Sequence, residues 1–337
     1  MKYSFIIPVF NRPDEVDELL DSLTKQSLKD FEVVVVEDGS SVKCDNVVKA
    51  YENHLNIKYF LKANSGPGQT RNYGVDRAEG EYVLILDSDV VLPTDYLQAV
   101  DAELRRQPCD AFGGPDRAHS SFSLMQKAIN YAMTSFFTTG GIRGGKKKLD
   151  KFYPRSFNMG VRREVYLALE GFSEMRFGED IDFSTRIFKG GYSCRLFPEA
   201  WVWHKRRTDL KKFFKQVHNS GIARINLTKR HPGTLKAVHL LPAVFTVGCA
   251  LLVVLTVVAA LCGCPHWWAL LTPFALFSLI IFADSALQSH SLQVGIRAVA
   301  ASFIQLWGYG TGFVRAWWER CVLGRGEFEA FNHNFYK

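Results

Sequence analysis

The feature that most constrains this chain is a long stretch without charged side chains: residues 237–283 contain no Asp, Glu, Lys or Arg. A helix that crosses a bilayer needs roughly 20 consecutive apolar residues, so this stretch is long enough for two such helices. A third candidate, residues 298–314, lies between Arg297 and Arg315. The sequence therefore predicts two or three transmembrane helices within residues 237–318.

Positive charge is concentrated directly before the apolar stretch. Residues 205–236 hold ten Lys or Arg residues and a single acid, Asp209. A basic segment beside a span is typical of the cytoplasmic side, so the formal charge of +7 predicts a membrane surface as a partner, and no nucleic acid. Apolar residues mixed with lysines at 209–228 predict an amphipathic interfacial helix, although Gly221 weakens the prediction of one unbroken helix.

The cysteines and the N-terminus both favour a reducing compartment. The sequence has seven cysteines and no C-x-x-C pair, and three of them, Cys249, Cys262 and Cys264, fall in the apolar stretch. Neither a disulfide framework nor a zinc site is indicated. The first residues carry no signal-peptide pattern. We therefore expect a multi-pass protein of the cell (inner) membrane whose N-terminal domain is cytoplasmic.

The first part of the chain alternates short apolar runs with helical patterns. Runs at 4–9, 31–36, 57–61 and 81–86 are typical of buried strands, and helical segments lie between them. This order predicts an α/β domain, Rossmann-like, with a mostly parallel sheet and helices on both faces. In such sheets, ligands bind beyond the carboxyl ends of the strands.

Acidic residues follow two of the predicted strands. Glu37-Asp38 follows the second, and Asp87-Ser88-Asp89 follows the fourth. Two carboxylates one residue apart could hold a hard cation such as Mg²⁺ together with substrate phosphates, and that cation would absorb the charge of a departing diphosphate. Either cluster alone is equally well explained by turn chemistry. Their convergence at one edge of the sheet favours a site for metal and nucleotide.

Three further positions could take part in chemistry. Glu179-Asp180 precedes a predicted helix and offers a general base for an acceptor hydroxyl, although acids at a helix N-terminus are also favoured by the dipole. Asp182 is a competing candidate at the same helix. His204 could be a metal ligand or phosphate partner, or a structural residue. Arg71 could pair with phosphate or a nucleobase, or lie on the surface.

Together these segments resemble the family 2 glycosyltransferases, which have the GT-A fold. The resemblance covers roughly residues 3–207, with the motifs in the family's order. Glu37 departs from the Asp more usual at that position, which changes side-chain length but not charge. The matching motifs are Phe5-Ile6-Ile7-Pro8-Val9-Phe10-Asn11, Val36-Glu37-Asp38-Gly39-Ser40, Gly66-Pro67-Gly68-Gln69-Thr70-Arg71-Asn72, Leu86-Asp87-Ser88-Asp89, Phe157-Asn158-Met159-Gly160 and Gly178-Glu179-Asp180-Ile181-Asp182-Phe183-Ser184-Thr185-Arg186.

The resemblance implies inverting transfer of a hexosyl or N-acetylhexosaminyl group from a UDP- or GDP-linked sugar, with Mg²⁺ or Mn²⁺ as cofactor. By position, Asp89 would ligate the metal, Asp87 would contact ribose or metal-bound water, and Asp180 would be the base. Asp38 would contact the nucleoside, and His204 would approach the metal or diphosphate. The same resemblance assigns Pro8, Val9, Asn11, Glu37, Arg71 and Ser88 to donor binding, and Asn158, Glu179 and Arg186 to the acceptor side or to support of the site.

The resemblance also suggests how the chain is divided and what it glycosylates. We expect a catalytic domain at 1–207, a basic amphipathic interfacial segment at 208–236, the spans at 237–318 and a tail at 319–337. Processive synthases of the family carry a Gln-x-x-Arg-Trp motif that this sequence lacks. We therefore expect a non-processive enzyme that acts on a lipid or lipid-linked acceptor in glycolipid or surface polysaccharide synthesis.

Two other classes of protein remain as alternatives. A nucleotidyltransferase also places nucleotide and metal on an α/β sheet, but it usually needs a basic glycine-rich loop after the first strand, where this chain has Asn11-Arg12-Pro13-Asp14. A membrane scaffold with an inactive transferase domain is the non-enzymatic alternative. The intact acids Asp87, Asp89 and Asp180 argue against it.

Overall fold

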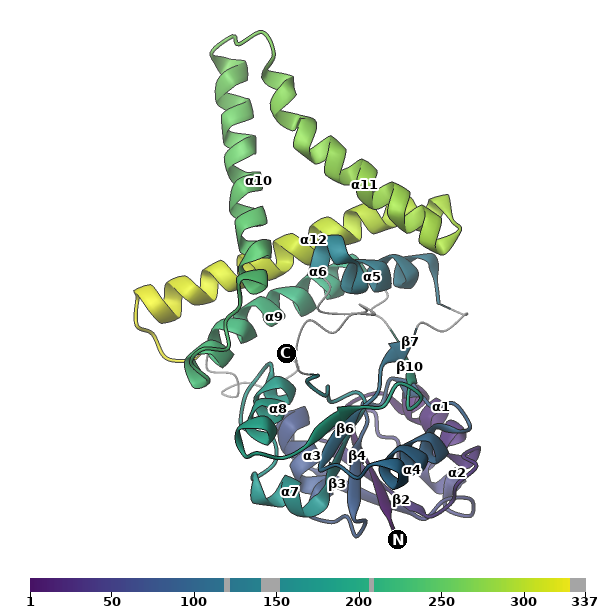
Figure 1. The fold of residues 1–337 in the computed structure, drawn as a ribbon. Helices are drawn as coiled ribbons and strands as arrows, with labels where there is room; N and C mark the ends of the chain where they lie inside the picture. The colour runs from purple at the N-terminus through teal and green to yellow at the C-terminus, as the bar shows by residue number, and fades with distance from the viewer. Residues whose placement is uncertain (118–121, 141–151, 206–208, 328–337) are drawn as a thin grey trace. The chain divides into compact units, whose positions relative to one another are not determined.

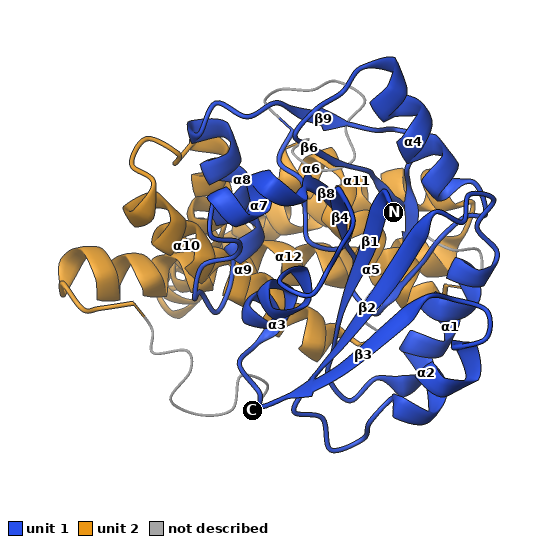
Figure 2. Cartoon of the chain, turned by 90° about the horizontal axis from the view of Figure 1, so that it is seen from below, with its two compact units in different colours: residues 1–119, 151–205, 328–337 blue, residues 120–150, 206–327 orange. Residues whose placement is uncertain are grey.

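A computed structural model describes residues 1–117, 122–140, 152–205 and 209–327 (Figure 1). The described chain forms two compact units, shown in different colours in Figure 2. One unit contains residues 1–117 and 152–205, and the other contains residues 122–140 and 209–327. The second unit is therefore built from two pieces of sequence, one of which interrupts the first unit.

A seven-stranded sheet organises the first unit, in the order β3-β2-β1-β4-β8-β6-β9. Strands β1 to β4 run parallel, as the alternation of strands and helices predicts. β8 lies antiparallel to both of its neighbours, whereas β6 and β9 run parallel to each other. The predicted mostly parallel α/β sheet is confirmed. The strands are Tyr3–Val9 (β1), Phe31–Asp38 (β2), Ile57–Lys62 (β3), Tyr82–Ile85 (β4), Ala111–Gly113 (β6), Met159–Arg162 (β8) and Cys194–Leu196 (β9).

Helices cover both faces of this sheet, and the side chains of β2 alternate between the two faces. Val33 and Val35 belong to one core cluster, and Val34 and Val36 belong to the other, because successive strand residues point to opposite faces. Every residue of β2 is buried, so Glu37 and Asp38 at its end also lie on opposite faces. The helices of this unit are Pro13–Thr24 (α1), Asp45–Tyr51 (α2), Pro67–Val75 (α3), Tyr96–Arg106 (α4), Arg163–Ala168 (α7) and Glu179–Lys189 (α8).

A second, three-stranded sheet lies next to the turn after β4. Its order is β5-β10-β7, with β5 at Val90–Val91, β10 at Val202–His204 and β7 at Asp116–Arg117. His204 pairs with Val90 in antiparallel register, and the backbone N–H of Lys205 donates to the carbonyl of Asp89 at 3.0 Å. This pairing brings His204 to the turn at 87–89, although the two segments are distant in the sequence.

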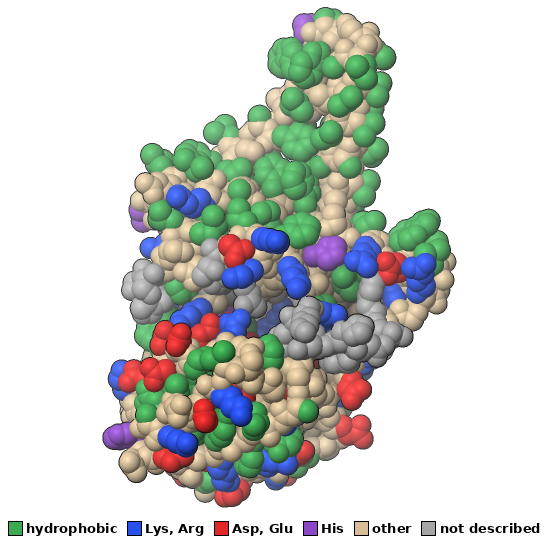
Figure 3. All heavy atoms as spheres, turned by 180° about the vertical axis from the view of Figure 1, so that it is seen from behind, with side chains coloured by type: hydrophobic (Ala, Val, Ile, Leu, Met, Phe, Trp, Pro, Cys, Tyr) green, Lys and Arg blue, Asp and Glu red, His purple; other side chains and the backbone are tan. Residues whose placement is uncertain are grey.

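The second unit consists of helices, two of which are long and apolar enough to cross a membrane: Ala237–Leu261 and Trp267–Ser289. Large hydrophobic side chains remain exposed along both, and Figure 3 shows them gathered there. The described helices of this unit are Leu124–Thr134 (α5), Phe136–Thr139 (α6), Leu210–Arg230 (α9), Ala237–Leu261 (α10), Trp267–Leu271 (η1), Thr272–Ser289 (α11), Leu292–Trp317 (α12) and Trp318–Val322 (η2).

The third span candidate, residues 298–314, lies inside α12, which is not among the helices that meet the length and composition of a span. One face of α12 packs tightly against α9 instead. A Cβ added at Gly221 would lie 2.1 Å from the carbonyl oxygen of Tyr309, and one added at Gly312 would lie 2.0 Å from that of His218. Gly221 does not break α9, which is continuous over 21 residues. Its missing side chain lets the two helix backbones approach.

Helix α5 belongs with the second unit, although it lies within the catalytic domain predicted at 1–207. Its residues Ile129 and Met133 are buried in one cluster with Phe213, Val217 and Ala301. An apolar helix face has to be buried against a partner, and α5 finds that partner in α9 and α12. The predicted single division of the chain therefore misses this interruption. The predicted boundary at 207/208 and the tail beyond 327 lie outside the described residues.

Candidate active site

Three potential metal ligands converge beyond the carboxyl end of β4. Asp87, Asp89 and His204 each offer one ligand atom, and these atoms lie within 4.8 Å of one another. His204 Nε2 lies 3.3 Å from Asp89 Oδ1, and the imidazole stacks on Phe157 with ring centroids 4.8 Å apart. The structure thus brings together the three residues assigned to a metal. That they bind one stays a prediction.

The chemistry of this donor set fits a divalent cation. Carboxylate oxygens are preferred by hard ions such as Mg²⁺ and Mn²⁺, and Mg²⁺ demands oxygen ligands in near-ideal octahedral geometry. Imidazole nitrogen favours first-row transition ions over Mg²⁺. Two carboxylates and one imidazole therefore suit Mn²⁺ better than Mg²⁺. Ser88, between the two aspartates, is buried.

Arg71 lies at the centre of a buried network of charges. Its side chain on α3 donates from Nη2 to Asp87 Oδ1 at 2.6 Å and from Nη1 to Glu179 Oε1 at 3.0 Å, and the residue is only 3% exposed. Burial acts to lower the pKa of this guanidinium, but Asp87 and Glu179 raise the pKa above its ordinary value. Arg71 thus joins the turn at residues 87–89 to the start of α8. Its predicted contact with the nucleotide stays a prediction.

The start of α8 separates two aspartates that the sequence could not tell apart. Asp182 is 2% exposed, and its Oδ2 accepts from the Ser173 hydroxyl at 2.7 Å and from Arg186 Nε at 2.9 Å. Asp180 is half-buried, and its Oδ1 accepts from the backbone N–H of Ile181 at 2.8 Å. Among the described residues, Arg155 lies 3.5 Å from its Oδ2, which exceeds a normal charge-assisted hydrogen bond. Asp182 is thus held by side chains from other parts of the unit, and the role of Asp180 as the base stays a prediction.

Arg186 supports the loop before α8. In addition to Asp182, it donates from Nη2 to the carbonyl of Gly171 at 2.6 Å and from Nη1 to the carbonyl of Leu169. Asn72 of α3 holds the same loop, because its side-chain amide donates to the carbonyl of Phe172 at 2.9 Å and its oxygen accepts from the Phe172 N–H at 2.8 Å. Arg186 therefore fixes the loop before α8, and its role on the acceptor side or in support of the site stays a prediction.

Glu179, next to the predicted base, is buried beside charged neighbours. Burial raises the pKa of its carboxyl group to about 6. The guanidinium of Arg71 opposes this shift, and the adjacent Asp180 adds to it. The carboxylate contacts Arg71 directly at 3.0 Å, which ties Arg71 to the first turn of α8. The role predicted for Glu179 on the acceptor side or in support of the site stays a prediction.

Asp38 is only 1% exposed, and donors from the loop after β3 surround its carboxylate. The backbone N–H groups of Ser65 and Gly66 donate to it at 2.8 and 2.9 Å, and Lys62 Nζ donates at 2.7 Å. The Asn64 amide adds a fourth contact at 3.2 Å. Asp38 therefore fixes the loop that begins α3. Its predicted contact with a nucleoside stays a prediction.

Glu37 lies on the opposite face of the sheet from Asp38. Its Oε2 accepts from the backbone N–H of Cys44 at 2.9 Å and from the Tyr59 hydroxyl at 2.8 Å. The side chain is fully buried. These contacts hold the turn between β2 and α2 in place. The contacts with Cys44 and Tyr59 account for the position of Glu37 without a bound donor, and its assigned role in donor binding stays a prediction.

The remaining predicted residues hold the backbone of the site. Asn11 has a left-handed φ of 55°, and its side-chain oxygen accepts from the N–H groups of Ser41 and Val42 at 2.8 Å each, as asparagine commonly does in turns. Asn158 is 1% exposed because its amide bonds Tyr96 at 2.7 Å and the Ala200 carbonyl at 2.8 Å. The end of β1 contributes Pro8, half-buried, and Val9, buried.

Comparison with known proteins assigns this domain. Residues 4–169 match the family described as "Glycosyl transferase family 2". This part of the chain is a family 2 glycosyltransferase domain. Over 135 residues it is 40% identical to the poly(ribitol-phosphate) β-N-acetylglucosaminyltransferase TarS of Staphylococcus aureus, which covers 39% of this chain but 22% of that relative. The chain thus spans about a fifth of the length of this relative.

Two further similarities extend the assignment. The chain is 35% identical over 115 residues to the GalNAc(5)-diNAcBac-PP-undecaprenol β-1,3-glucosyltransferase of Campylobacter jejuni, which covers 33% of this chain and 37% of that protein. A mannosyltransferase of Pyrobaculum calidifontis, solved with GDP-Man and Mn²⁺, superimposes with a TM-score of 0.63 at 20% identity and covers 90% of this chain and 87% of that one. The predicted GT-A fold of this family 2 member is confirmed.

Some contacts of the family 2 domain could not be foreseen from the sequence. Arg155 contacts the predicted base but lies in a segment with no recognisable pattern. Lys62 pairs with Asp38, and only its place at the end of a predicted strand points toward the site. Phe172 lies under the Arg71 guanidinium, 5.2 Å from ring centroid to Cζ. No signal in a single sequence identifies this last contact, because it joins two distant segments.

Proposed function

We propose that this family 2 member is an inverting glycosyltransferase that moves a sugar from a UDP- or GDP-linked donor to a lipid or lipid-linked acceptor hydroxyl at a membrane. The observation that carries the proposal is the convergence of Asp87, Asp89 and His204 at the sheet edge. Arg71 joins this cluster to Glu179, the first residue of α8, which also carries Asp180. A transferase needs a cation site for the diphosphate and a base for the acceptor in one place.

The chemistry follows from the two ends of this arrangement. Asp180 accepts the proton of the acceptor hydroxyl as that oxygen bonds to the anomeric carbon. The bond from that carbon to the diphosphate oxygen breaks, its electron pair leaves with the nucleoside diphosphate, and the anomeric configuration inverts. A divalent cation held by Asp87, Asp89 and His204 would supply charge stabilisation for the departing diphosphate. Arg71 keeps Asp87 and the start of α8 in a fixed relation.

The proposal includes the identity of the metal. The imidazole of His204 beside two carboxylates supports Mn²⁺ over Mg²⁺. The donor would bind with its nucleoside near the loop fixed by Asp38 and its diphosphate toward the metal. The supporting contacts of Asn11, Asn158 and Arg186 would then preorganise the backbone around the donor.

The membrane is part of the proposal because the second unit carries two helices of span length. With two spans, both ends of the hairpin lie on the same side, and the basic segment at 209–236 favours the cytoplasmic side. The catalytic unit would then work at the cytoplasmic face of the cell membrane. The C. jejuni relative, whose name includes an undecaprenol-linked acceptor, supports a lipid-linked acceptor here.

Thermal unfolding of the detergent-purified protein tests the proposal directly. We would measure the unfolding temperature with a panel of nucleotide sugars, with Mn²⁺, with Mg²⁺ and with chelator. Stabilisation by one donor that disappears on chelation is expected. An inactive scaffold would neither bind nor hydrolyse any donor, with or without lipid acceptor. A nucleotidyltransferase would instead be stabilised by nucleoside triphosphates.

A further inference from the structure

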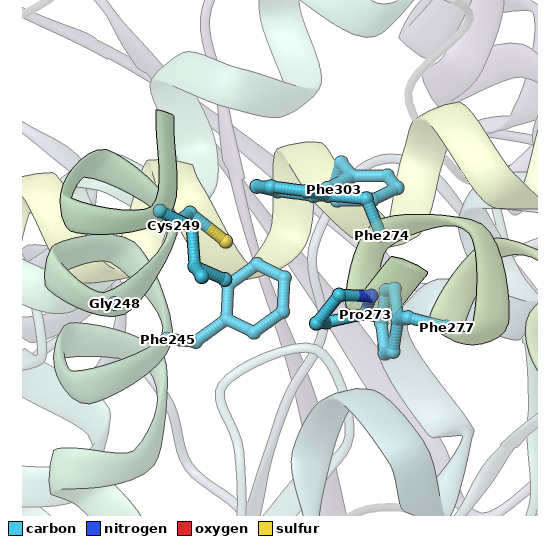
Figure 4. A pocket seen from close by; sticks show the side chains of 8 residues that line it. Phe245, Gly248, Cys249, Pro273, Phe274, Phe277 and Phe303 are labelled. Atoms are coloured by element: carbon cyan, nitrogen blue, oxygen red, sulfur yellow. The ribbon is translucent and has the colours of Figure 1, made fainter. Parts of the chain in front are cut away.

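An apolar cavity of about 200 Å³ lies among α10, α11 and α12 in the second unit. Figure 4 shows the side chains around it, with the Cys249 sulfur and several rings facing the space between two helices. The cavity has no charged residue in its wall. Its lining is Phe245, Gly248, Cys249, Leu252, Pro273, Phe274, Phe277 and Phe303.

The wall is a set of rings that fix one another. Phe245 lies 5.3 Å from Phe277 and 6.0 Å from Phe303 between centroids, and Phe277 lies 5.3 Å from Phe303. Phe274 adds a fourth ring, 6.4 Å from Phe303. Because these residues come from three helices, the cavity has a shape defined by tertiary packing. Rings at such separations pack favourably.

One side of the cavity is open at Gly248, where an added Cβ would meet no atom within 4 Å. The flanking residues Val247 and Leu251 are 47% and 58% exposed, so the cavity is continuous with the apolar outer surface of α10. Its depth along the membrane follows from helix geometry. With a rise of about 1.5 Å per residue, Phe245 and Leu252 lie roughly 12 and 22 Å from the start of α10 at Ala237.

The depth and the apolar wall of the cavity indicate which kind of molecule it could bind. A depth of roughly 12–22 Å falls within a hydrocarbon core about 30 Å thick. A sugar or phosphate there would lack hydrogen-bond partners and would be strongly disfavoured. A cavity of similar size lined by apolar residues stays dry and accepts a small hydrocarbon, so the volume suits one segment of a lipid chain.

The start of α10 offers a place for an anionic head. Lys236 precedes the first turn of α10, and its backbone N–H donates to His239 Nδ1 at 3.1 Å. A diphosphate at this end and a chain that follows α10 to the cavity would match both features. A lipid-linked acceptor has this combination of groups.

We infer that the cavity binds the hydrocarbon chain of the lipid-linked acceptor and so selects acceptors by their chain. The inference rests on the proposed function, because it assigns a second contact to the same substrate. Lipid tails are as apolar as the cavity wall, so selectivity comes from packing against the rings. We therefore expect a moderate effect, about three- to tenfold, when the cavity is filled.

The test uses the full-length protein in nanodiscs of phosphatidylethanolamine and phosphatidylglycerol, with a benzophenone-tagged undecaprenyl diphosphate as the probe. Gly248→Leu places a large side chain at the open side of the cavity, and Gly248→Ala is the matched control that adds a single carbon there. We expect photo-crosslinks to peptides of α10 or α11, competed by untagged undecaprenyl diphosphate and weaker by about three- to tenfold in Gly248→Leu alone.

Three outcomes would overturn the inference. They are crosslinks outside these helices, equal crosslinking in both variants, and no competition by undecaprenyl diphosphate, which would mean that bulk bilayer lipid fills the cavity. Donor binding with Mn²⁺ is measured on the same samples. Donor binding should be the same in both variants, and it should be absent only if the proposed function is wrong. A failure of the proposed function can therefore be told apart from a failure of the inference about the cavity.

Discussion

The turn after β2 and the turn after β4 carry the same signature in the sequence, an acid directly after a buried strand, but they have different structures. Asp38, the last residue of β2, accepts from two backbone N–H groups and a lysine. Asp89, after β4, faces His204 and Asp87 in an arrangement that suits a cation. Asp38 thus holds a loop, whereas Asp87 and Asp89 lie beside His204 in the donor set that we propose for a metal.

The same contrast recurs inside α8. Asp182 is held by the side chains of Ser173 and Arg186, whereas Asp180 accepts from the adjacent backbone N–H of Ile181 and, among the described residues, has Arg155 at 3.5 Å. Two carboxylates within one helical turn can therefore differ in function because of their partners alone. Substitutions that keep size but remove charge distinguish the two kinds of acid.

The largest effect is expected for Asp180→Asn. Removal of the base should lower kcat by about a hundred- to ten-thousandfold, while the stabilisation by donor and Mn²⁺ should persist. Steady-state kinetics and thermal unfolding measure the two quantities. Asp182→Asn is the matched control, for which we expect lower thermal stability as the main effect. Near-normal turnover in Asp180→Asn would remove that residue from the role of base.

Asp89→Ala should abolish the metal-dependent part of donor binding. We expect the affinity for donor in the presence of Mn²⁺ to fall by more than about 100-fold. Loss of a hydrogen-bond partner of a metal ligand already lowers affinity by up to about 100-fold, and loss of the ligand itself should cost more. Calorimetric titration of Mn²⁺ and of donor with and without Mn²⁺ would measure this. If the variant binds donor with the wild-type response to Mn²⁺, the metal is held by other residues.

Asp38→Asn should act on stability. The substitution leaves Lys62 without its buried counter-charge, and breaking a buried ion pair costs about 3 kcal/mol or more. Donor binding well below the unfolding temperature should change less than in Asp89→Ala. Urea unfolding of the purified protein measures the loss, and the exposed Asp30→Asn provides the control. A stable Asp38→Asn protein with lost nucleotide binding would instead place Asp38 in contact with the nucleoside.

Glu179→Gln tests an acid that is paired with Arg71 and nevertheless has a raised pKa. A folded-state pKa of about 6 above an ordinary 4.5 means that the folded state holds the proton more tightly. This tighter proton binding stabilises the folded protein below pH 4.5. The stabilisation, about 2 kcal/mol, is lost as pH rises through about 6. Thermal unfolding between pH 4.5 and 7.5 should show this slope in the wild type and less of it in Glu179→Gln. Identical slopes would contradict the raised pKa.

Much of this arrangement could be predicted from the sequence, because the patterns involved are local. The order of strands and helices fixed the parallel half of the sheet, and the strand ends placed Asp87 and Asp89 at one edge. The reversed strand β8 and the convergence of His204 needed pairing between distant segments. The fates of Asp180 and Asp182 depended on Ser173 and Arg155, whose positions no spacing reveals.

The helices of the second unit show a similar limit. The absence of charge in residues 237–283 predicts two helices of span length, and the structure has two. Residues 298–314 of α12 are a third candidate in the sequence, because composition alone does not show what a helix packs against. Gly221 seemed to interrupt α9, since a glycine in a helix is unfavourable when considered alone. Its close approach to Tyr309 supplies a reason that lies outside the helix itself.

The placement of α5 has a practical consequence for work with this protein. A version cut after residue 205 would keep every residue of the predicted active site, yet it would also keep α5 without α9 and α12. The apolar side chains of Ile129, Ala132 and Met133, now buried, would face water. Such a truncated protein would be expected to aggregate. Removing residues 120–150 as well would take this apolar helix out of the truncated protein.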